Sequence, residues 1–288
     1  MICRALPYYE FAQGVFEIDE FDCASIFVIV GSERAVVLDT GVGIGDLKWV
    51  IENRITDKPY DVVISHHHGD HIGGAGWFDE VWVHPDDLDW NQSDTAPTMR
   101  FRREYAETIR LREHRHYSYE AERDIRPWPA MPRKRAITDG QVFDLGNRKV
   151  TVHHCPGHTK GEIVLIDDLT RTLFLGDACN CNLLLGRDIA PTGPERFKTA
   201  LSGLRRIVSL NDQYDTLYNS HHDFRGFGSP LAPSVLPDAV RCLQSLVDCA
   251  AEFKQIPDSL FPDRPPKTVA VCGDVMISYL DGDISDPL

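Results

Sequence analysis

The sequence has no surplus of positive charge. Its 30 Lys and Arg residues stand against 44 Asp and Glu residues, which gives a formal net charge of −14 over 288 residues. A chain of this sign is repelled by phosphate backbones and by anionic lipid unless it carries a local basic patch. We therefore expect no nucleic-acid partner and no charge-driven association with a membrane.

Long apolar runs are also absent. No run approaches the roughly 18 apolar residues that a membrane-spanning helix requires. The first ten residues (MICRALPYYE) lack the uninterrupted apolar stretch of a signal peptide. The 8 cysteines are scattered, with no Cys-x-x-Cys pair and no dense framework. These features predict a cytoplasmic protein whose thiols are reduced and mostly structural.

The sequence does contain enough apolar material for a large core, since 42% of its residues are hydrophobic. Strands come in blocks that are followed by helices, which predicts an α/β protein with two packed sheets between outer helices, in four layers. We expect one domain over residues 1–288. The expected elements are a hairpin over 25–39, strands at 61–65, 81–83, 141–145, 149–153, 162–167, 172–175 and 215–218, helices at 46–55, 101–115, 194–207 and 232–253, and a hairpin over 268–279.

Residues 86–135 differ in composition from the rest of the chain. Between residues 100 and 135 there are 11 basic side chains and 6 acidic ones, a local excess of +5 in an acidic protein. We interpret this segment as an inserted helical lid within the domain. Its basic residues fit either a solvated helical face with glutamate partners or a mouth that recruits an anionic substrate.

Nine of the 12 histidines fall in three clusters, each at the end of a predicted strand. In the segment 65–71 (SHHHGDH), the alternation of an extended chain points His66 and His68 to the same side. The glycine that follows permits a turn that returns Asp70 and His71 to that side. Imidazoles together with a carboxylate form a ligand set suited to zinc. Further ligands would come from the later strand ends, from His158, Asp177 and His221.

The segment HHHGDH, read as His-x-His-x-Asp-His, resembles the signature of the metallo-β-lactamase-fold hydrolases, in the branch of glyoxalase II and the lactonases. The later segments CPGHT, LFLGDA and NSHH resemble that family's later motifs in order and context, over roughly residues 10–225 outside the insertion. The resemblance implies an αββα sandwich with two metal ions in a groove along its edge. It implies one metal held by His66, His68 and His158, a second held by Asp70, His71 and His221, and Asp177 as the bridge between them.

The function that this resemblance implies is hydrolysis by a zinc pair, with iron or manganese as alternative metals. A hydroxide shared by the two metals would attack a small ester-like bond, a thioester or a lactone, and Asp70 would orient it as the catalytic carboxylate. The substrate would be a small molecule, and the basic insertion is compatible with an anionic one. The sequence is also compatible with a homodimer. The alternatives are a mononuclear-iron sulfur dioxygenase of the same fold, a β-lactam hydrolase and a metal-binding member without activity.

Departures from the family pattern narrow this interpretation. His68 stands where the diiron oxidoreductases of the fold carry a carboxylate, which favours hydrolytic zinc chemistry. Ser220 stands where the family has a glycine before the last ligand, so His222 remains an alternative to His221, which we prefer. Ordinary packing is expected for three histidines and for two cysteines close to Asp177, namely His84, His114, His116, Cys179 and Cys181. We expect no ligand role for His67, His153 and His154, although His67 could line the groove.

Overall fold

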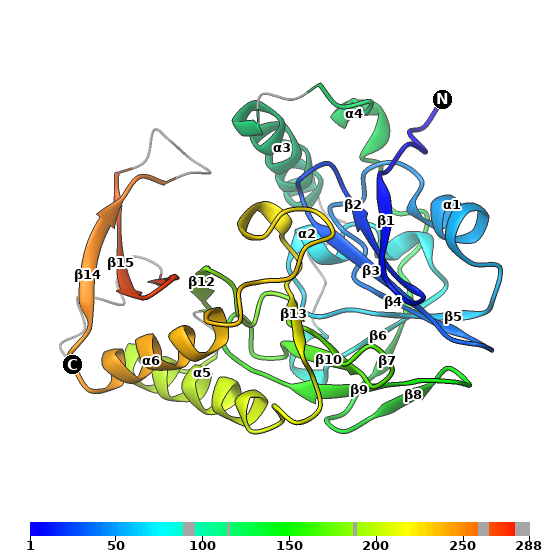
Figure 1. Cartoon of the computed structure of the whole chain (residues 1–288). Coiled ribbons are helices and arrows are strands. Elements are labelled where there is room, and N and C mark those ends of the chain that lie inside the picture. The colour runs from blue at the N-terminus through cyan, green and yellow to red at the C-terminus, as the bar shows by residue number, and fades with distance from the viewer. Residues whose placement is uncertain (89–95, 114–115, 187–188, 259–264, 280–288) are drawn as a thin grey trace.

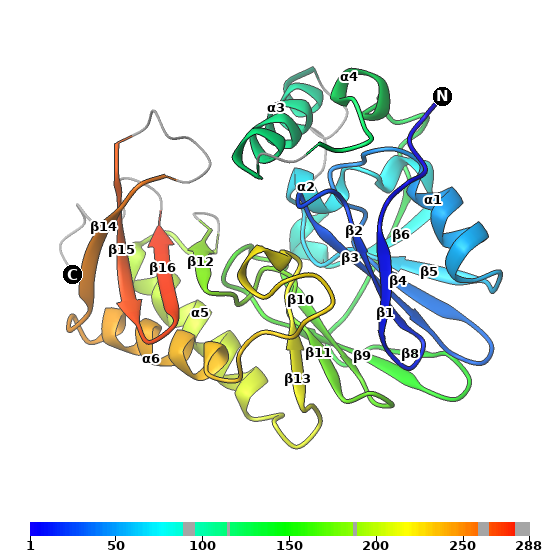
Figure 2. The same cartoon turned by 45° about the horizontal axis from the view of Figure 1, so that its top comes forward.

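The computed structural model of the chain describes residues 1–88, 96–113, 116–186, 189–258 and 265–279. Two β-sheets pack face to face, and helices cover the outer face of each (Figures 1 and 2). This arrangement confirms the predicted α/β class and its four layers.

The first sheet is antiparallel in its first half and parallel in its second half. The run SIFVIV and the run AVVL form its centre as the predicted hairpin, and both are buried almost throughout because the sheet is covered on both faces. Its seven strands lie in the order β1 (Tyr8–Ala12), β2 (Val15–Asp19), β3 (Ser25–Val30), β4 (Ala35–Leu38), β5 (Tyr60–Val63), β6 (Glu80–Val83) and β7 (Arg133–Ala136).

The second sheet supplies the other half of the sandwich. Its inner face packs on the first sheet through a core that includes Phe27, Leu38, Leu165 and Phe174, and such burial of apolar area is the main term that stabilises the fold. Its five strands lie in the order β13 (Thr216–Tyr218), β11 (Thr172–Phe174), β10 (Ile163–Asp167), β9 (Lys149–His154) and β8 (Val142–Asp144).

The helices divide between the two outer faces. Residues of α1 (Leu47–Val50), η1 (Ile51–Ile55) and α3 (Ala96–Glu113) share a core with the first sheet. Residues of α5 (Gly193–Val208) and α6 (Val235–Val247) share a core with the second. In the described ranges, no helix has both the length and the apolar character needed to cross a membrane. The remaining short helices are α2 (Gly69–Ile72), η2 (Ala75–Trp77), η3 (Pro85–Asp87), α4 (Ala121–Asp124) and η4 (His222–Phe224).

A third sheet lies beyond α5 and α6, at the left of Figures 1 and 2. The predicted hairpin over 268–279 exists, but it belongs to this separate sheet. The helix predicted over 232–253 ends at Val247, because Cys249 adopts a left-handed conformation (φ 56°) and the chain then turns into a strand. The four strands lie in the order β12 (Asn182–Leu185), β16 (Val275–Tyr279), β15 (Lys267–Cys272) and β14 (Glu252–Ile256).

The predicted insertion, residues 86–135, contains α3 and α4, and its last residues enter β7 of the first sheet. Helix α3 lies beside α2 in both views, and α4 lies next to α3. Helix α3 begins five residues earlier than the predicted helix and ends at Glu113, next to residues outside the described ranges. Several arginines of α3 and α4 pair with acidic side chains, as a solvated helical face would. The pairs include Arg100–Glu104, Arg103–Glu122, Arg110–Glu107, Arg112–Asp223 and Arg123–Glu120.

Arg102 is the arginine that anchors α3 to the body of the protein. It is only 1% exposed, and its guanidinium donates to the carbonyl oxygens of Val42 (2.6 Å) and Arg126 (3.4 Å). The loop that receives it is held from the other side by Glu20, whose carboxylate accepts three backbone N–H groups from residues 42–44. Burial raises the pKa of Glu20 to about 8, although these hydrogen bonds and Arg102 oppose the shift.

We expect Arg102→Ala to lower the free energy of unfolding by about 3 kcal/mol, because it removes buried hydrogen bonds made by a charged donor. Urea unfolding followed by circular dichroism measures the change. The control is Arg100→Ala on the same helix, whose side chain is 76% exposed in its pair with Glu104, and its effect should stay within about 0.5 kcal/mol. Equal stability of the two variants would contradict the anchoring role.

Candidate metal centre

Four strand ends bring the predicted ligands to one edge of the sandwich. The segment His66–His71 follows β5, His158 follows β9, Asp177 follows β11 and His221 follows β13. The loops are fixed to one another by backbone hydrogen bonds: Ile163 N–H donates to Ser65 O (3.0 Å), and Ser220 N–H donates to Gly176 O (2.9 Å). The edge where the two sheets meet therefore positions the ligand-bearing loops.

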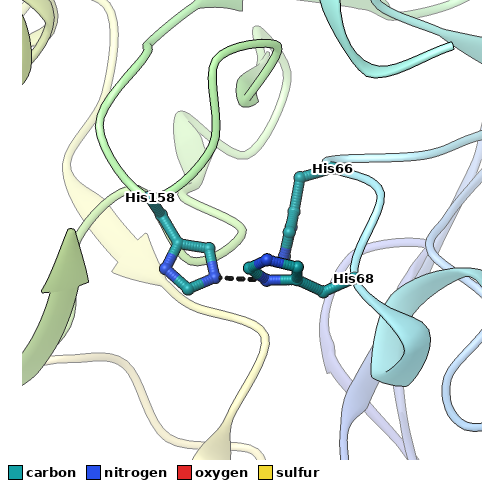
Figure 3. A group of neighbouring side chains, drawn as sticks. All are labelled: His66, His68 and His158. Carbon is teal, nitrogen blue, oxygen red and sulfur yellow. Dashed lines mark hydrogen bonds between the residues drawn. The ribbon is translucent and has the colours of Figure 1, made fainter. Parts of the chain in front are cut away.

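His66, His68 and His158 form the first group (Figure 3). Nδ1 of His68 lies 2.8 Å from Nε2 of His158, and the ring of His66 stands nearly perpendicular to the rings of both others. One ligand atom from each residue lies within 4.8 Å of the other two. The structure thus brings together the three residues that the resemblance assigns to one metal.

Asp70, His71 and His221 form the second group, with Asp177 between it and the first. Oδ2 of Asp70 lies 3.6 Å from Nε2 of His71 and 3.6 Å from Nε2 of His221. Oδ2 of Asp177 lies 3.2 Å from Nε2 of His221, 3.6 Å from Nε2 of His71 and 3.6 Å from Nε2 of His158. One carboxylate oxygen therefore faces ligands of both groups.

A second set of buried groups fixes the orientation of the imidazoles. Nδ1–H of His71 donates to Asp39 Oδ2 (3.0 Å), and Nδ1–H of His158 donates to Leu184 O (2.7 Å). His66 Nδ1 lies 2.9 Å from Ser65 Oγ and 3.3 Å from Glu162 Oε2. These contacts hold Nδ1 of each ring and leave Nε2 directed into the centre, as second contacts of metal-binding histidines do.

Asp39 and Glu162 were missed by the sequence analysis. Asp39 follows β4 and also accepts hydrogen bonds from Ser65 N–H (2.7 Å) and Ser65 Oγ–H (2.8 Å). Glu162 precedes β10, and its Oε1 accepts from Asp177 N–H (3.0 Å). The available signal was an acidic residue directly next to an apolar strand, after β4 for Asp39 and before β10 for Glu162. Both side chains are completely buried, whereas an acidic residue in an ordinary surface turn would be exposed to solvent.

Burial and neighbouring charges set the protonation of the two groups apart. Burial, followed by the neighbouring imidazoles, holds the pKa of His66 and of His68 well below the ordinary range, so these rings are neutral. Burial also lowers the pKa of His71 and His221, but nearby carboxylates outweigh it; Asp177 and Asp70 raise the pKa of His221 to about 9. Burial raises the pKa of Asp177, yet His221 and His71 together hold it well below its usual value.

The donor set fits divalent transition metals. Ligands about 2.0–2.1 Å from a tetrahedral zinc ion lie roughly 3.3 Å apart, close to the separations of 3.2 to 3.6 Å between Asp177 and its histidines. Buried polar atoms without a hydrogen-bond partner are costly unless something else satisfies them. Three such atoms among the described residues belong to the predicted ligands, namely His66 Nε2, His71 Nε2 and Asp177 Oδ1, and a fourth, Glu162 Oε2, lies behind His66.

The structure separates His221 from His222. The ring of His222 turns away from the centre, with Nε2 2.9 Å from Asp22 Oδ1 and Nδ1 3.2 Å from Ser25 Oγ. His221 alone of the two reaches Asp70 and Asp177. His222, the alternative to His221 as the last ligand, therefore contacts Asp22 and Ser25 and not the two ligand groups.

The other histidines and the two nearby cysteines lie outside the two groups. His67 faces Asp87 (3.1 Å), and the rings of His84 and His154 stack at 4.0 Å. Cys179 is buried in the core beneath the second sheet, and Cys181 packs against the same core. His116 lines a hollow between α3 and α4, His153 is partly buried on β9, and His114 lies outside the described residues.

Known proteins resemble this chain in sequence and in fold. A family model described as the Metallo-beta-lactamase superfamily matches residues 20–180. The acyl-coenzyme A thioesterase MBLAC2 of Homo sapiens is 32% identical over 229 residues, which cover 73% of this chain and 78% of that protein. The hydroxyacylglutathione hydrolase of Pseudomonas savastanoi pv. phaseolicola is 27% identical over 227 residues, 76% of this chain and 68% of that protein.

A solved structure agrees at the level of the fold. The metallo-beta-lactamase from Pontibacter korlensis superposes with a TM-score of 0.56 at 16% identity, over 83% of this chain and 99% of that one. The predicted resemblance, the fold and the hydrolase class are thereby confirmed. Because the family match spans more than half of the 288 residues, the chain belongs to the metallo-beta-lactamase superfamily.

Proposed function

We propose that this protein is a dinuclear zinc hydrolase that cleaves thioesters, with lactones as the next substrate class. The observation that carries the proposal is the position of Asp177 Oδ2, which lies 3.2 to 3.6 Å from imidazole nitrogens of both ligand groups. The first metal would be held by His66, His68 and His158. The second would be held by Asp70, His71 and His221, and Asp177 would bridge the two.

The names of the relatives support a thioester. One is named an acyl-coenzyme A thioesterase and another a hydroxyacylglutathione hydrolase, and both names denote cleavage of an acyl group from a sulfur atom. The chemistry agrees, because a thiol has a pKa of about 8.5 and its thiolate leaves with little help from a general acid. We therefore place thioesters before lactones and β-lactams.

Two bound divalent cations would lower the pKa of water and polarise the carbonyl oxygen of the substrate. Asp70 is partly exposed at the centre, and its carboxylate would orient the attacking water by accepting a hydrogen bond. Asp39 and Glu162 would hold the rings of His71 and His66 in place. These buried contacts limit the reorganisation that the reaction needs.

We further infer that residues 1–288 act as one domain with residues 86–135 as an insertion. Helix α3 of the insertion packs into the same core as the first sheet, which supports this division. The ion pairs on α3 use acidic residues of the same segment, such as Glu104 and Glu107. The excess of +5 over residues 100–135 therefore remains, and an anionic substrate stays compatible with the insertion.

The purified protein should contain about two zinc ions per chain by elemental analysis. A chelator should abolish thioester hydrolysis and added zinc should restore it, because the metals supply the Lewis acid. A panel of thioesters, lactones, β-lactams and phosphodiesters measures the preference. One iron per chain with thiol-dependent oxygen uptake would overturn the proposal.

His221→Ala should lose about one zinc ion per chain and at least about 100-fold in kcat/KM for a thioester, because it removes a ligand of the second group. His222→Asn is the matched control, since the neighbouring ring contacts Asp22 and Ser25 instead. It should keep both zinc ions. Loss of a zinc ion in His222→Asn but not in His221→Ala would identify His222 as the last ligand.

Glu162→Gln should weaken zinc binding by roughly 10- to 100-fold, because it replaces the carboxyl oxygen behind His66 with an amide, while an oxygen remains to accept from Asp177 N–H. Competition with a chromogenic chelator gives the affinity independently of turnover. Glu252→Gln, on an exposed position of β14, serves as the control. Equal affinity of the two variants would remove Glu162 from the metal centre.

A further inference from the structure

We propose that α3 carries an acyl-binding subsite beside the metal centre, formed by the ring of Phe101 with Tyr105 behind it. The subsite would hold the apolar acyl chain of a thioester. This inference rests on the proposed function, because it takes the substrate carbonyl to lie at the metal ligands.

Phe101 lies directly against the metal-binding loop. A Cβ atom built on Gly69 would come within 3.0 Å of two carbon atoms of the Phe101 ring, so the ring rests on the one residue between His68 and Asp70. Phe101 is nevertheless 44% exposed. An apolar surface thus lies next to ligands of both groups, open to solvent.

The ring is held in place from behind. Phe101 and Tyr105 are one helical turn apart on α3, and their rings stack with centroids 5.8 Å apart. Tyr105 packs against the main core, and its hydroxyl donates to Cys23 O (3.4 Å). Arg102, next to Phe101, anchors the helix at Val42. The surface is therefore ordered before any substrate arrives, which lowers the entropic cost of binding.

The acyl half of the substrate fits this surface better than the carrier half. With the carbonyl at the metals, a thioester extends one substituent on each side of the reacting carbon. A half-exposed phenyl ring gains from contact with methylene groups, at roughly 0.8 kcal/mol for each one fully buried. A polar carrier offers less apolar area to that ring. We therefore assign Phe101 to the acyl chain.

The test compares acyl-CoA thioesters from acetyl to octanoyl on the zinc-loaded enzyme. In the wild type, kcat/KM should rise about twofold or more per methylene, up to the fourfold that full burial gives. Phe101→Ala should lose at least about tenfold more with octanoyl than with acetyl, and Phe101→Leu should recover part of the slope. Leu111→Ala is the control, since Leu111 is a 58% exposed apolar residue on the same helix.

The carrier is varied in a second series at constant acyl group, with coenzyme A against pantetheine. A Phe101→Ala effect that follows the carrier instead of the chain length would overturn the assignment to the acyl half. An equal loss at every chain length would reduce Phe101 to a structural role. A slope unchanged by Phe101→Ala would also refute the subsite.

Binding of the product carboxylates tests the subsite independently of the proposed thioesterase activity. Calorimetry on the zinc-loaded protein should show octanoate binding more tightly than acetate, with the difference lost in Phe101→Ala. If the wild type hydrolyses no thioester but keeps this Phe101-dependent difference, the proposed function fails and the apolar subsite stands. If neither turnover nor the difference is found, both fail.

Discussion

The candidate centre depends on one carboxylate, that of Asp177, which is buried between imidazoles from three different loops. An isolated buried charge would be expensive, and here the imidazoles of His221 and His71 compensate it. The backbone N–H of Asp177 donates to Glu162, which fixes the position of the residue. Both sheets must end at the same edge for these partners to meet. The packing of the sandwich is thus the condition for the chemistry.

The candidate ligands of residues 66–71 could be predicted from sequence because they follow local rules of chain geometry. Alternation along an extended segment separates His66 and His68 from His67, and a glycine returns Asp70 and His71 to the same side. Asp39, Glu162 and Phe101 follow no such rule. Each acts through a contact with a segment that lies far along the chain, at His71, His66 and Gly69 respectively, and only the folded arrangement shows it.

The elements of the fold also differ in how far their sequence predicts them. The β-branched runs of β3, β4 and β10 are apolar enough to identify themselves as buried strands. The third sheet was missed because its first strand, β12, is short and the left-handed residue Cys249 interrupts what reads as one continuous helical pattern. Strand β14 carries exposed residues at four of its five positions, so no hydrophobic pattern marks it.

Metal binding and contact with the acyl chain depend on different elements of the fold. All seven candidate ligands lie on loops of the sandwich, whereas the exposed ring of Phe101 belongs to a helix that is tied down by Arg102 at Val42. Residues on the open face of that helix can therefore change without moving a ligand. Substitutions on α3 could therefore adapt the same reaction centre to acyl groups of different size.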